Sequence, residues 1–159
     1  VAAAGWAADV ARFAGTWIPD RNQGSVIDSA IVGFVSHLPA EELETSKERL
    51  EAVNQPIGKL CITVVDSGRK VEFGYDGRSG LAVPVDGSST QIKGGSGEAV
   101  QLRVAMEAGK LLEAYQAQDG KRTNRYALSP DGKTMIMEVK VESPHMPMPL
   151  EYKVAFARK

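Results

Sequence analysis

The chain of 159 residues has one cysteine, two histidines and only 6% aromatic side chains. The single cysteine, Cys61, excludes an intrachain disulfide and a cysteine-rich metal site. It falls in an alternating apolar segment, which favours a small buried side chain over a reactive thiol. No apolar run approaches the ~18 residues that a membrane-spanning helix requires. We therefore expect one domain over residues 1–159 with no membrane span.

The chain also lacks a charge excess of either sign. Nineteen basic and 20 acidic residues give a formal net charge of −1. Nucleic-acid binding requires a basic excess or a basic stripe along one face, and no basic cluster goes beyond a pair such as Lys121-Arg122. Nucleic acid is therefore not an expected partner. Nothing in the sequence sets the oligomeric state.

Motifs that would mark an enzyme are missing too. The sequence contains no nucleophile elbow, no phosphate-cradling glycine loop and no His-Glu-x-x-His helix. We predict no catalytic residue, no cofactor and no metal site, and favour a non-enzymatic function. Glu113 beside Tyr115 would be a candidate acid or base if it were buried. Leu111 and Leu112 are both apolar, which leaves the strand phase ambiguous, and an exposed Glu113 is the favoured interpretation.

The segment Ser143–Pro149 is unusual because it combines His145, Met146 and Met148 with three prolines. Histidine and methionine are soft ligands that suit Cu(I). The prolines indicate an extended, stiff connection between two strands. We favour the structural interpretation over a copper site.

Small residues open the chain as Val1-Ala2-Ala3-Ala4. Such residues often surround a signal-peptidase site. A chain shortened at this point for any other reason would begin with the same residues. The expectation is an exported protein, periplasmic or secreted.

Helical periodicity occupies residues 25–53. Ser25 followed by Asp28 resembles a capping box, and apolar residues then recur at helical spacing over 27–38. Pro39 is placed to open a second, highly charged helix that continues to Val53. We predict a buried first helix covered by a solvated second one, together forming a cap.

From Leu60 onward apolar and polar residues alternate, which is typical of strands with one buried face. Short connections force neighbouring strands to pair antiparallel, and a long meander tends to close because closure removes its edges. We predict an all-β fold, an up-and-down barrel of eight to ten strands with two helices between strands one and two. Asp-Gly pairs, which favour tight hairpin turns, occur at Asp76-Gly77, Asp86-Gly87, Asp119-Gly120 and Asp131-Gly132.

With Gly15-Thr16-Trp17 after a short apolar helix, and Phe156-Ala157-Arg158 at the far end, this meander resembles the calycin superfamily. That superfamily groups lipocalins with fatty-acid-binding proteins. The resemblance implies that Trp17 and Arg158 close the barrel, with the basic side chain covering the indole ring. The helix pair is more like the fatty-acid-binding branch, whereas residues 13–25 resemble bacterial exported lipocalin-like domains. The Arg-x-Tyr grip of fatty-acid-binding proteins is replaced by Val154-Ala155-Phe156.

The inward face of the predicted barrel is mostly aliphatic and rich in methionine. Apolar walls with a few convergent polar groups suit a lipophile with a polar head, and the planar fork of Arg122 matches a carboxylate. The opposite strand phase would instead put Arg122 in solvent or in a salt bridge. The predicted ligand-binding residues are Arg122, Tyr126, Asn124, Tyr152, Met135, Met137, Phe73 and Phe34.

Three functions follow from this barrel. The favoured one is non-enzymatic binding or carriage of a small hydrophobic ligand, a fatty acid or similar lipophile, with the helical cap gating entry. The second is a small enzyme that acts on a lipophilic substrate in the same lumen. The third is a structural or interaction protein whose barrel is filled by its own side chains.

Overall fold

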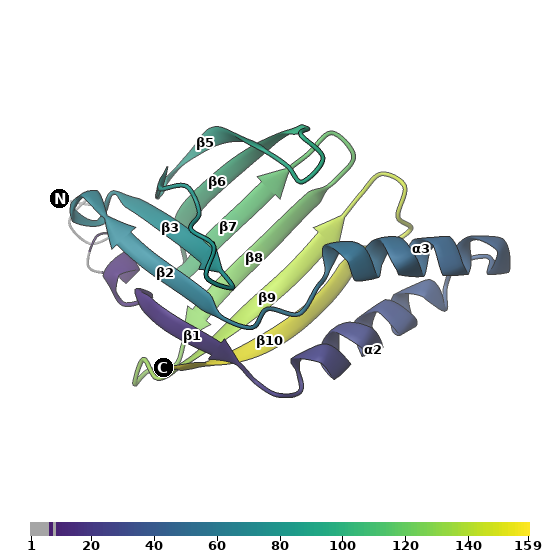
Figure 1. Ribbon diagram of the computed structural model, residues 1–159, viewed down its shortest axis with the longest axis horizontal. Helices are drawn as coiled ribbons and strands as arrows, with labels where there is room; N and C mark the ends of the chain where they lie inside the picture. The colour runs from purple at the N-terminus through teal and green to yellow at the C-terminus, as the bar shows by residue number, and fades with distance from the viewer. Residues whose placement is uncertain (1–6, 8) are drawn as a thin grey trace.

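The computed structural model describes residues 7 and 9–159 and shows ten strands that curve around one interior, with two helices at one end (Figure 1). Residues 1–4, on which the expectation of export rests, lie outside the described residues. The helices are α2 (Gln23–Val35) and α3 (Ala40–Val53). The strands are β1 (Gly15–Pro19), β2 (Leu60–Val65), β3 (Lys70–Tyr75), β4 (Val83–Pro84), β5 (Asp86–Lys93), β6 (Ala99–Glu107), β7 (Lys110–Gln116), β8 (Lys121–Leu128), β9 (Thr134–Glu142) and β10 (Leu150–Arg158).

All ten strands belong to one antiparallel sheet in the order β4-β3-β2-β1-β10-β9-β8-β7-β6-β5. The first strand lies between the second and the last, so it joins the two halves of the meander. The two edges of the sheet, β4 and β5, follow one another in the chain with only Val85 between them, and β4 also contacts β6, but no ladder joins the two edges. The barrel is therefore nearly closed, and the predicted up-and-down barrel with helices after strand one is confirmed.

The helix pair differs in burial as its composition predicts. Helix α2 packs against β10 and α3 and buries its apolar stripe, whereas Leu50 is the one buried residue of α3. The predicted capping box is wrong, because α2 begins two residues before Ser25 at Gln23. The Ser25 hydroxyl donates to the carbonyl of Asn22 at 2.9 Å instead of capping a free N–H group.

Three of the four Asp-Gly pairs lie between antiparallel neighbours, as predicted. Asp76-Gly77 follows β3, where both residues have positive φ, and the pairs at 119–120 and 131–132 connect β7 to β8 and β8 to β9. The prediction of a hairpin turn is wrong for Asp86-Gly87. This pair opens β5 at a shift of register against β6 between Asp86 and Ser89. Gly87, with φ of 86°, serves a bulge there.

One end of the barrel is closed by the two ends of the meander. Trp17 and Arg158 are partners across β1 and β10, and the guanidinium carbon lies 4.3 Å from the indole centroid. Arg158 also donates to the carbonyls of Arg12, Ala14 and Gly132. The Trp17 indole N–H donates to the carbonyl of Phe13 at 3.0 Å. This end of the barrel is therefore held by one cation and its acceptors.

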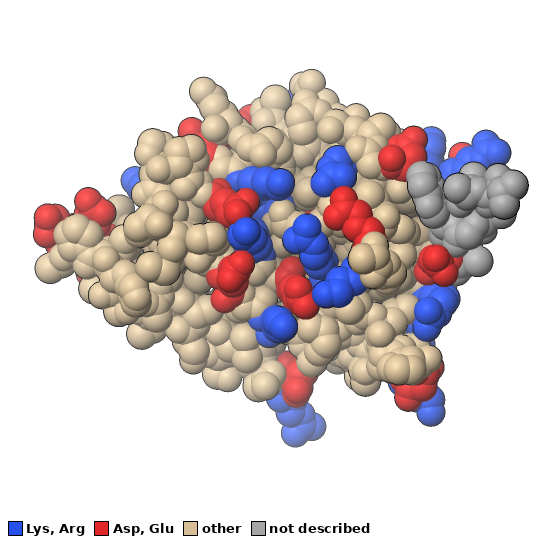
Figure 2. All heavy atoms as spheres, turned by 180° about the vertical axis from the view of Figure 1, so that it is seen from behind, with Lys and Arg blue, Asp and Glu red and all other residues tan. Residues whose placement is uncertain are grey.

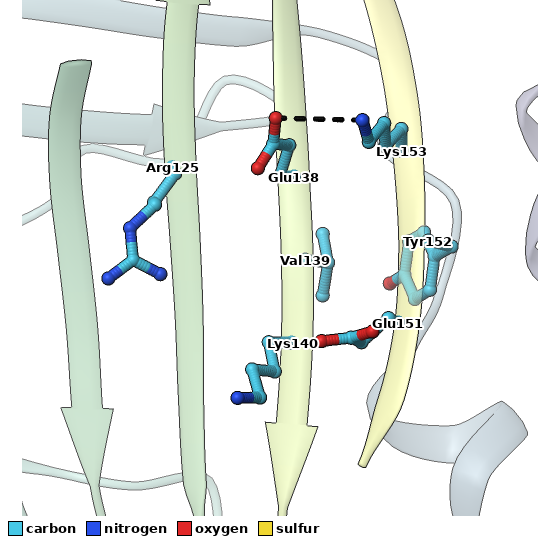
Figure 3. A pocket seen from close by; sticks show the side chains of 7 residues that line it. All are labelled: Arg125, Glu138, Val139, Lys140, Glu151, Tyr152 and Lys153. Carbon is cyan, nitrogen blue, oxygen red and sulfur yellow. Dashed lines mark ion pairs between the residues drawn. The ribbon is translucent and has the colours of Figure 1, made fainter. Parts of the chain in front are cut away.

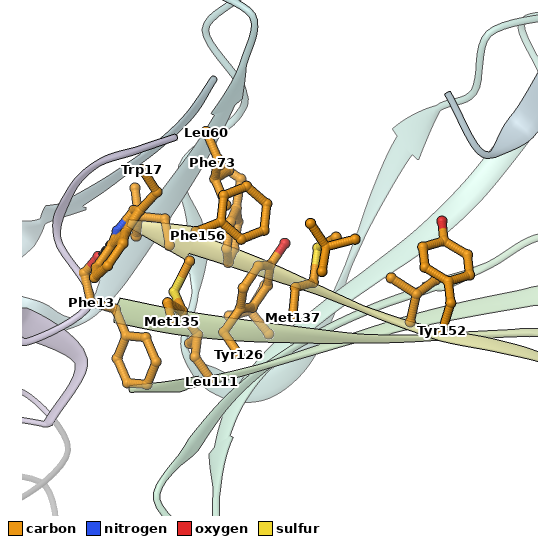
Figure 4. Packing of buried hydrophobic residues seen from close by; sticks show 14 of the residues in the cluster. Phe13, Trp17, Leu60, Phe73, Leu111, Tyr126, Met135, Met137, Tyr152 and Phe156 are labelled. Atoms are coloured by element: carbon orange, nitrogen blue, oxygen red, sulfur yellow. Dashed lines mark hydrogen bonds between the residues drawn. The ribbon is translucent and has the colours of Figure 1, made fainter. Parts of the chain in front are cut away.

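The interior above Trp17 is densely packed. Figure 4 shows Phe13, Trp17, Met135 and Phe156 gathered at this end, with Tyr126 further along the barrel. The rings of Phe73 and Tyr126 stack with centroids 5.5 Å apart. Many inward side chains expose 1% or less of their surface, among them Leu111, Tyr126, Met135 and Met137. These side chains are therefore shielded from solvent.

Gly15 is required by the closure. It has φ of +139°, and a Cβ atom there would lie 2.6 Å from the Arg158 guanidinium. We predict that Gly15→Ala destabilises the protein by about 1–3 kcal/mol, since backbone strain of this kind costs that much. Gly33→Ala is the matched control, because nothing lies near its Cβ position in α2 and alanine favours a helix by about 1 kcal/mol. Urea unfolding of both variants measures this, and equal stabilities would contradict it.

Candidate functional site

The phase of β7 and β8 decides which polar side chains enter the barrel. Glu113 is opposite Asn124, and Tyr115 is opposite Arg122, in the antiparallel register. Since side chains alternate along a strand, these four lie on the same face as Leu111, which is fully buried. The inward face of β7 and β8 therefore carries a run of polar groups.

Glu113 is the centre of this run and is completely buried. Its Oε1 atom accepts hydrogen bonds from Tyr75, Asn124 and Tyr126 at 2.7, 2.9 and 2.8 Å. Its Oε2 atom accepts from the Tyr115 hydroxyl at 2.5 Å. An ionised carboxylate only accepts hydrogen bonds, so four donors match its needs. We call these five residues the Glu113 cluster.

The tyrosines of the Glu113 cluster are held in their protonated form. Burial raises the pKa of Tyr75, Tyr115 and Tyr126 well above its usual range, and the negative charge of Glu113 raises it further. Burial also raises the pKa of Tyr152, against the opposing effect of Arg122. Protonated phenols are the donors that the buried carboxylate requires.

Arg122 lies beside the Glu113 cluster at the helix end of the barrel and is bound by neutral groups. Its Nε donates to the Asn124 side-chain oxygen at 3.2 Å, and one terminal nitrogen donates to the Val53 carbonyl and to Asn54 at 2.9 and 3.1 Å. The other terminal nitrogen donates to Tyr152 at 3.3 Å. No carboxylate of the described residues forms an ion pair with it.

Asn124 connects the two charges without letting them meet. Its amide nitrogen donates to Glu113, while its oxygen accepts from Arg122. The buried Asn54 continues the network, because its oxygen accepts from Tyr152 at 2.8 Å as well as from Arg122. The polar groups therefore form one chain from the middle of the barrel to the end of α3.

A pocket of about 390 Å³ opens above this network. One wall is the end of α3 and the connection after it, residues 52–57, which contribute Val53, Pro56 and Ile57. The floor consists of polar side chains from β3, β7 and β8, namely Tyr75, Asp76, Tyr115, Arg122 and Asn124. We call this the mouth pocket. Its apolar wall and polar floor suit an amphiphilic molecule.

Two other pockets lie outside the barrel interior. A groove of about 400 Å³ separates the helices from the connection between β9 and β10, with Phe34, Leu50 and Met146 among its lining residues. A third depression, of about 270 Å³, lies on the outside of β8, β9 and β10 among five charged side chains, and includes the 3.7 Å ion pair of Glu138 with Lys153 (Figure 3). Its charges largely balance, so it has no preference for one sign.

The predicted ligand-binding residues fall into different environments. Arg122 and Asn124 lie in the floor of the mouth pocket, Tyr152 binds Arg122 directly behind it, and Phe34 lines the groove beside the helices. The other four belong to the packed core: Phe73, Tyr126, Met135 and Met137. Ligand binding by these eight residues stays a prediction.

Sequence reasoning expected Glu113 to be exposed, and that expectation is wrong. The neighbouring Leu112 is buried although it faces outward. Ion pairs on the outer faces of β6 to β10, such as Arg125 with Glu107 and Lys110 with Glu138, surround it. Figure 2 shows basic and acidic side chains interleaved across the back of the molecule. The signal that predicts a buried Glu113 is the alternation along the strand, which places it on the same face as Leu111 and Tyr115.

The connection between β9 and β10, which contains His145, is held by hydrogen bonds of its own backbone. The Ser143 hydroxyl and carbonyl accept from the backbone N–H groups of His145 and Met146, at 3.2 and 3.0 Å, and Met146 packs against the core. Residues 7 and 9–159 contain no group of three or more His, Cys, Asp or Glu side chains placed to hold a metal ion. Neither of the two described helices combines the length and hydrophobicity needed to cross a membrane.

No protein-family model and no curated protein sequence matches the chain. Solved structures do match it over nearly their whole length. The fluorescent protein UnaG is 14% identical, with a TM-score of 0.60 over 94% of this chain and 99% of that one. Lipid binding protein 8 of Caenorhabditis elegans is 10% identical, with a TM-score of 0.56 over 93% and 96%. Fatty-acid-binding protein 1 of Echinococcus granulosus is 11% identical, with a TM-score of 0.55 over 92% and 97%.

These likenesses and the ten-stranded barrel with its helix pair after β1 define the fold as a calycin barrel of the fatty-acid-binding-protein type. The predicted calycin resemblance is confirmed at the level of fold. The closer likeness to bacterial exported lipocalin-like domains stays a prediction.

All four tyrosines of the chain have a raised pKa, which predicts an abrupt alkaline transition. Unfolded tyrosines ionise near pH 10, so the unfolded state loses protons first and stability falls as the pH rises above that value. Tyrosinate absorbance should therefore appear only together with loss of the circular dichroism of the sheet. Gradual ionisation near pH 10 in a folded protein would contradict this prediction.

Proposed function

We propose that the chain binds a small hydrophobic molecule with an acidic head, a fatty acid or similar lipophile, without chemical conversion. The observation that carries this proposal is the position of Arg122 and the neutral character of its hydrogen-bond partners. Its guanidinium borders the mouth pocket and is bound only by neutral acceptors among the described residues. A cation held this way retains its charge for a ligand anion, and a hydrogen bond between two charged groups is stronger than one between neutral groups.

The surroundings of Arg122 support an amphiphilic ligand. The connection after α3 supplies apolar surface within the same pocket, so a hydrophobic tail has a wall to cover. Proteins named for lipid and fatty-acid binding share the fold. The hydrogen bonds of Arg122 to Val53 and Asn54 fix the end of α3 beside the pocket. The helical cap therefore gates entry of the ligand to the pocket.

A second candidate has an observation of its own. The inward side chains below the mouth pocket are buried and belong to one core cluster, as expected of a structural or interaction protein with a filled barrel. Such a protein would bind neither an anionic dye nor a fatty acid. The same titration therefore separates the two candidates.

The head-group role of Arg122 is tested by Arg122→Gln, with Arg125→Gln as the matched control. Both arginines are on β8, but Arg125 faces outward and pairs with Glu107. The probe is anilinonaphthalene sulfonate, displaced by decanoate. We expect Arg122→Gln to weaken decanoate binding by about tenfold or more, because a hydrogen bond to a charged group contributes about 1.5–3 kcal/mol. Arg125→Gln should bind like the parent.

Arg122→Lys distinguishes a loss of the binding group from a loss of binding that is caused by misfolding. It keeps the charge but loses the fork, so it should melt close to the parent and bind decanoate with intermediate strength. Decanoate binding by Arg122→Gln that equals that of Arg125→Gln would overturn the proposed function.

A further inference from the structure

The Glu113 cluster joins walls of the barrel that are not neighbours. Tyr75 comes from β3, whereas Glu113 and Tyr126 come from β7 and β8. Strands β2, β1, β10 and β9 lie between β3 and β8 in the sheet. The Tyr75 hydroxyl nevertheless donates to Glu113 at 2.7 Å and lies 3.1 Å from the Tyr126 hydroxyl. These bonds form a polar bridge across the interior.

Below the bridge the barrel is occupied by buried side chains. Tyr126 stacks on Phe73, and Leu111, Met135 and Met137 are buried completely or almost so. Figure 4 shows Met135 between the Trp17 end and Tyr126, with Met137 on the other side of Tyr126 and Tyr152 further along in that direction. An alkyl chain entering this region would have to displace packed side chains. The mouth pocket of about 390 Å³ lies above the bridge, with Tyr75 among its lining residues.

Charge opposes deep entry by an acid as well. Both oxygens of Glu113 are already bound by the donors around them. A ligand carboxylate that passed the bridge would meet a like charge in a medium of low dielectric constant, where repulsion is strong. At the mouth, Arg122 uses four of its five N–H groups within the described residues. An anionic head is therefore held at Arg122, above the bridge.

We propose that the mouth pocket takes a compact amphiphilic carboxylate and that Tyr75 and Glu113 determine this specificity by closing the barrel to extended chains. This inference rests on the proposed function, since it assumes that an acid binds at Arg122. It adds the size of the ligand, its position above the bridge, and the residues that set both.

The test is the dependence of affinity on chain length. Straight-chain carboxylates from hexanoate to tetradecanoate, below their micelle concentrations, displace anilinonaphthalene sulfonate from the protein. Each methylene that becomes buried should tighten binding roughly fourfold. We expect that gain over the first members only, followed by a plateau, because longer chains extend into water. A continued gain of that size to tetradecanoate would overturn the inference while leaving the proposed function intact.

Tyr75→Ala and Tyr75→Phe identify the residue responsible. Tyr75→Ala removes the ring and should move the plateau to longer chains. Tyr75→Phe loses the same hydrogen bonds but keeps the ring, so its plateau should match the parent's. Tyr75→Phe therefore controls for any effect on binding that comes only from the stability lost with these hydrogen bonds. A plateau that stays in place in Tyr75→Ala would overturn the role of the bridge. Failure of every carboxylate to displace the dye from the parent would instead overturn the proposed function.

Discussion

A single buried carboxylate determines how the interior of this barrel is arranged. Taking a charge out of water costs several kcal/mol even after the protein relaxes, so Glu113 needs donors on all sides. Three of the four tyrosines of the chain and Asn124 provide them. Because those donors come from β3, β7 and β8, satisfying one charge also fixes the spacing of opposite walls. An interior organised this way is closed by its own hydrogen bonds.

The two ends of the barrel are built on different physics. At one end the exposed Arg158 donates to three backbone carbonyls and covers Trp17, so it serves the closure. At the other end Arg122 is bound by neutral side chains and one carbonyl beside an open pocket. Backbone carbonyls and the indole ring hold Arg158 at the closure of the barrel, whereas the partners of Arg122 place its charge beside the mouth pocket. The barrel therefore has a closed apolar end and a polar open end.

Much of the fold could be predicted because its signals are local. Alternation from Leu60 onward, the helical periodicity before it and three of the four Asp-Gly pairs each depend on a few adjacent residues. The pairing of Trp17 with Arg158 was reached through resemblance, since 141 positions separate the two in the numbering. Asp86-Gly87 was mistaken for a hairpin because a bulge and a tight turn both use a glycine with positive φ.

The candidate site could be predicted only in part. Arg122 was assigned to the interior by alternation, but the Glu113 cluster depends on contacts from β3 to β8 that no local pattern encodes. Leu112 misled the phase of β7 because it is buried on the outer face among long charged side chains. The methylene stems of such side chains cover apolar surface while their charges stay in water. Two adjacent leucines thus both read as core.

Asn124 explains how one small interior can hold two opposite charges for different purposes. A direct bond between Glu113 and Arg122 would neutralise both and leave neither free for a ligand. The Asn124 amide donates to the carboxylate and accepts from the guanidinium, so each charge is satisfied without cancelling the other. Glu113 then draws its remaining donors from phenols, and Arg122 is left with neutral partners. The separation of these charges by one amide is what makes the open end of the barrel a candidate anion site.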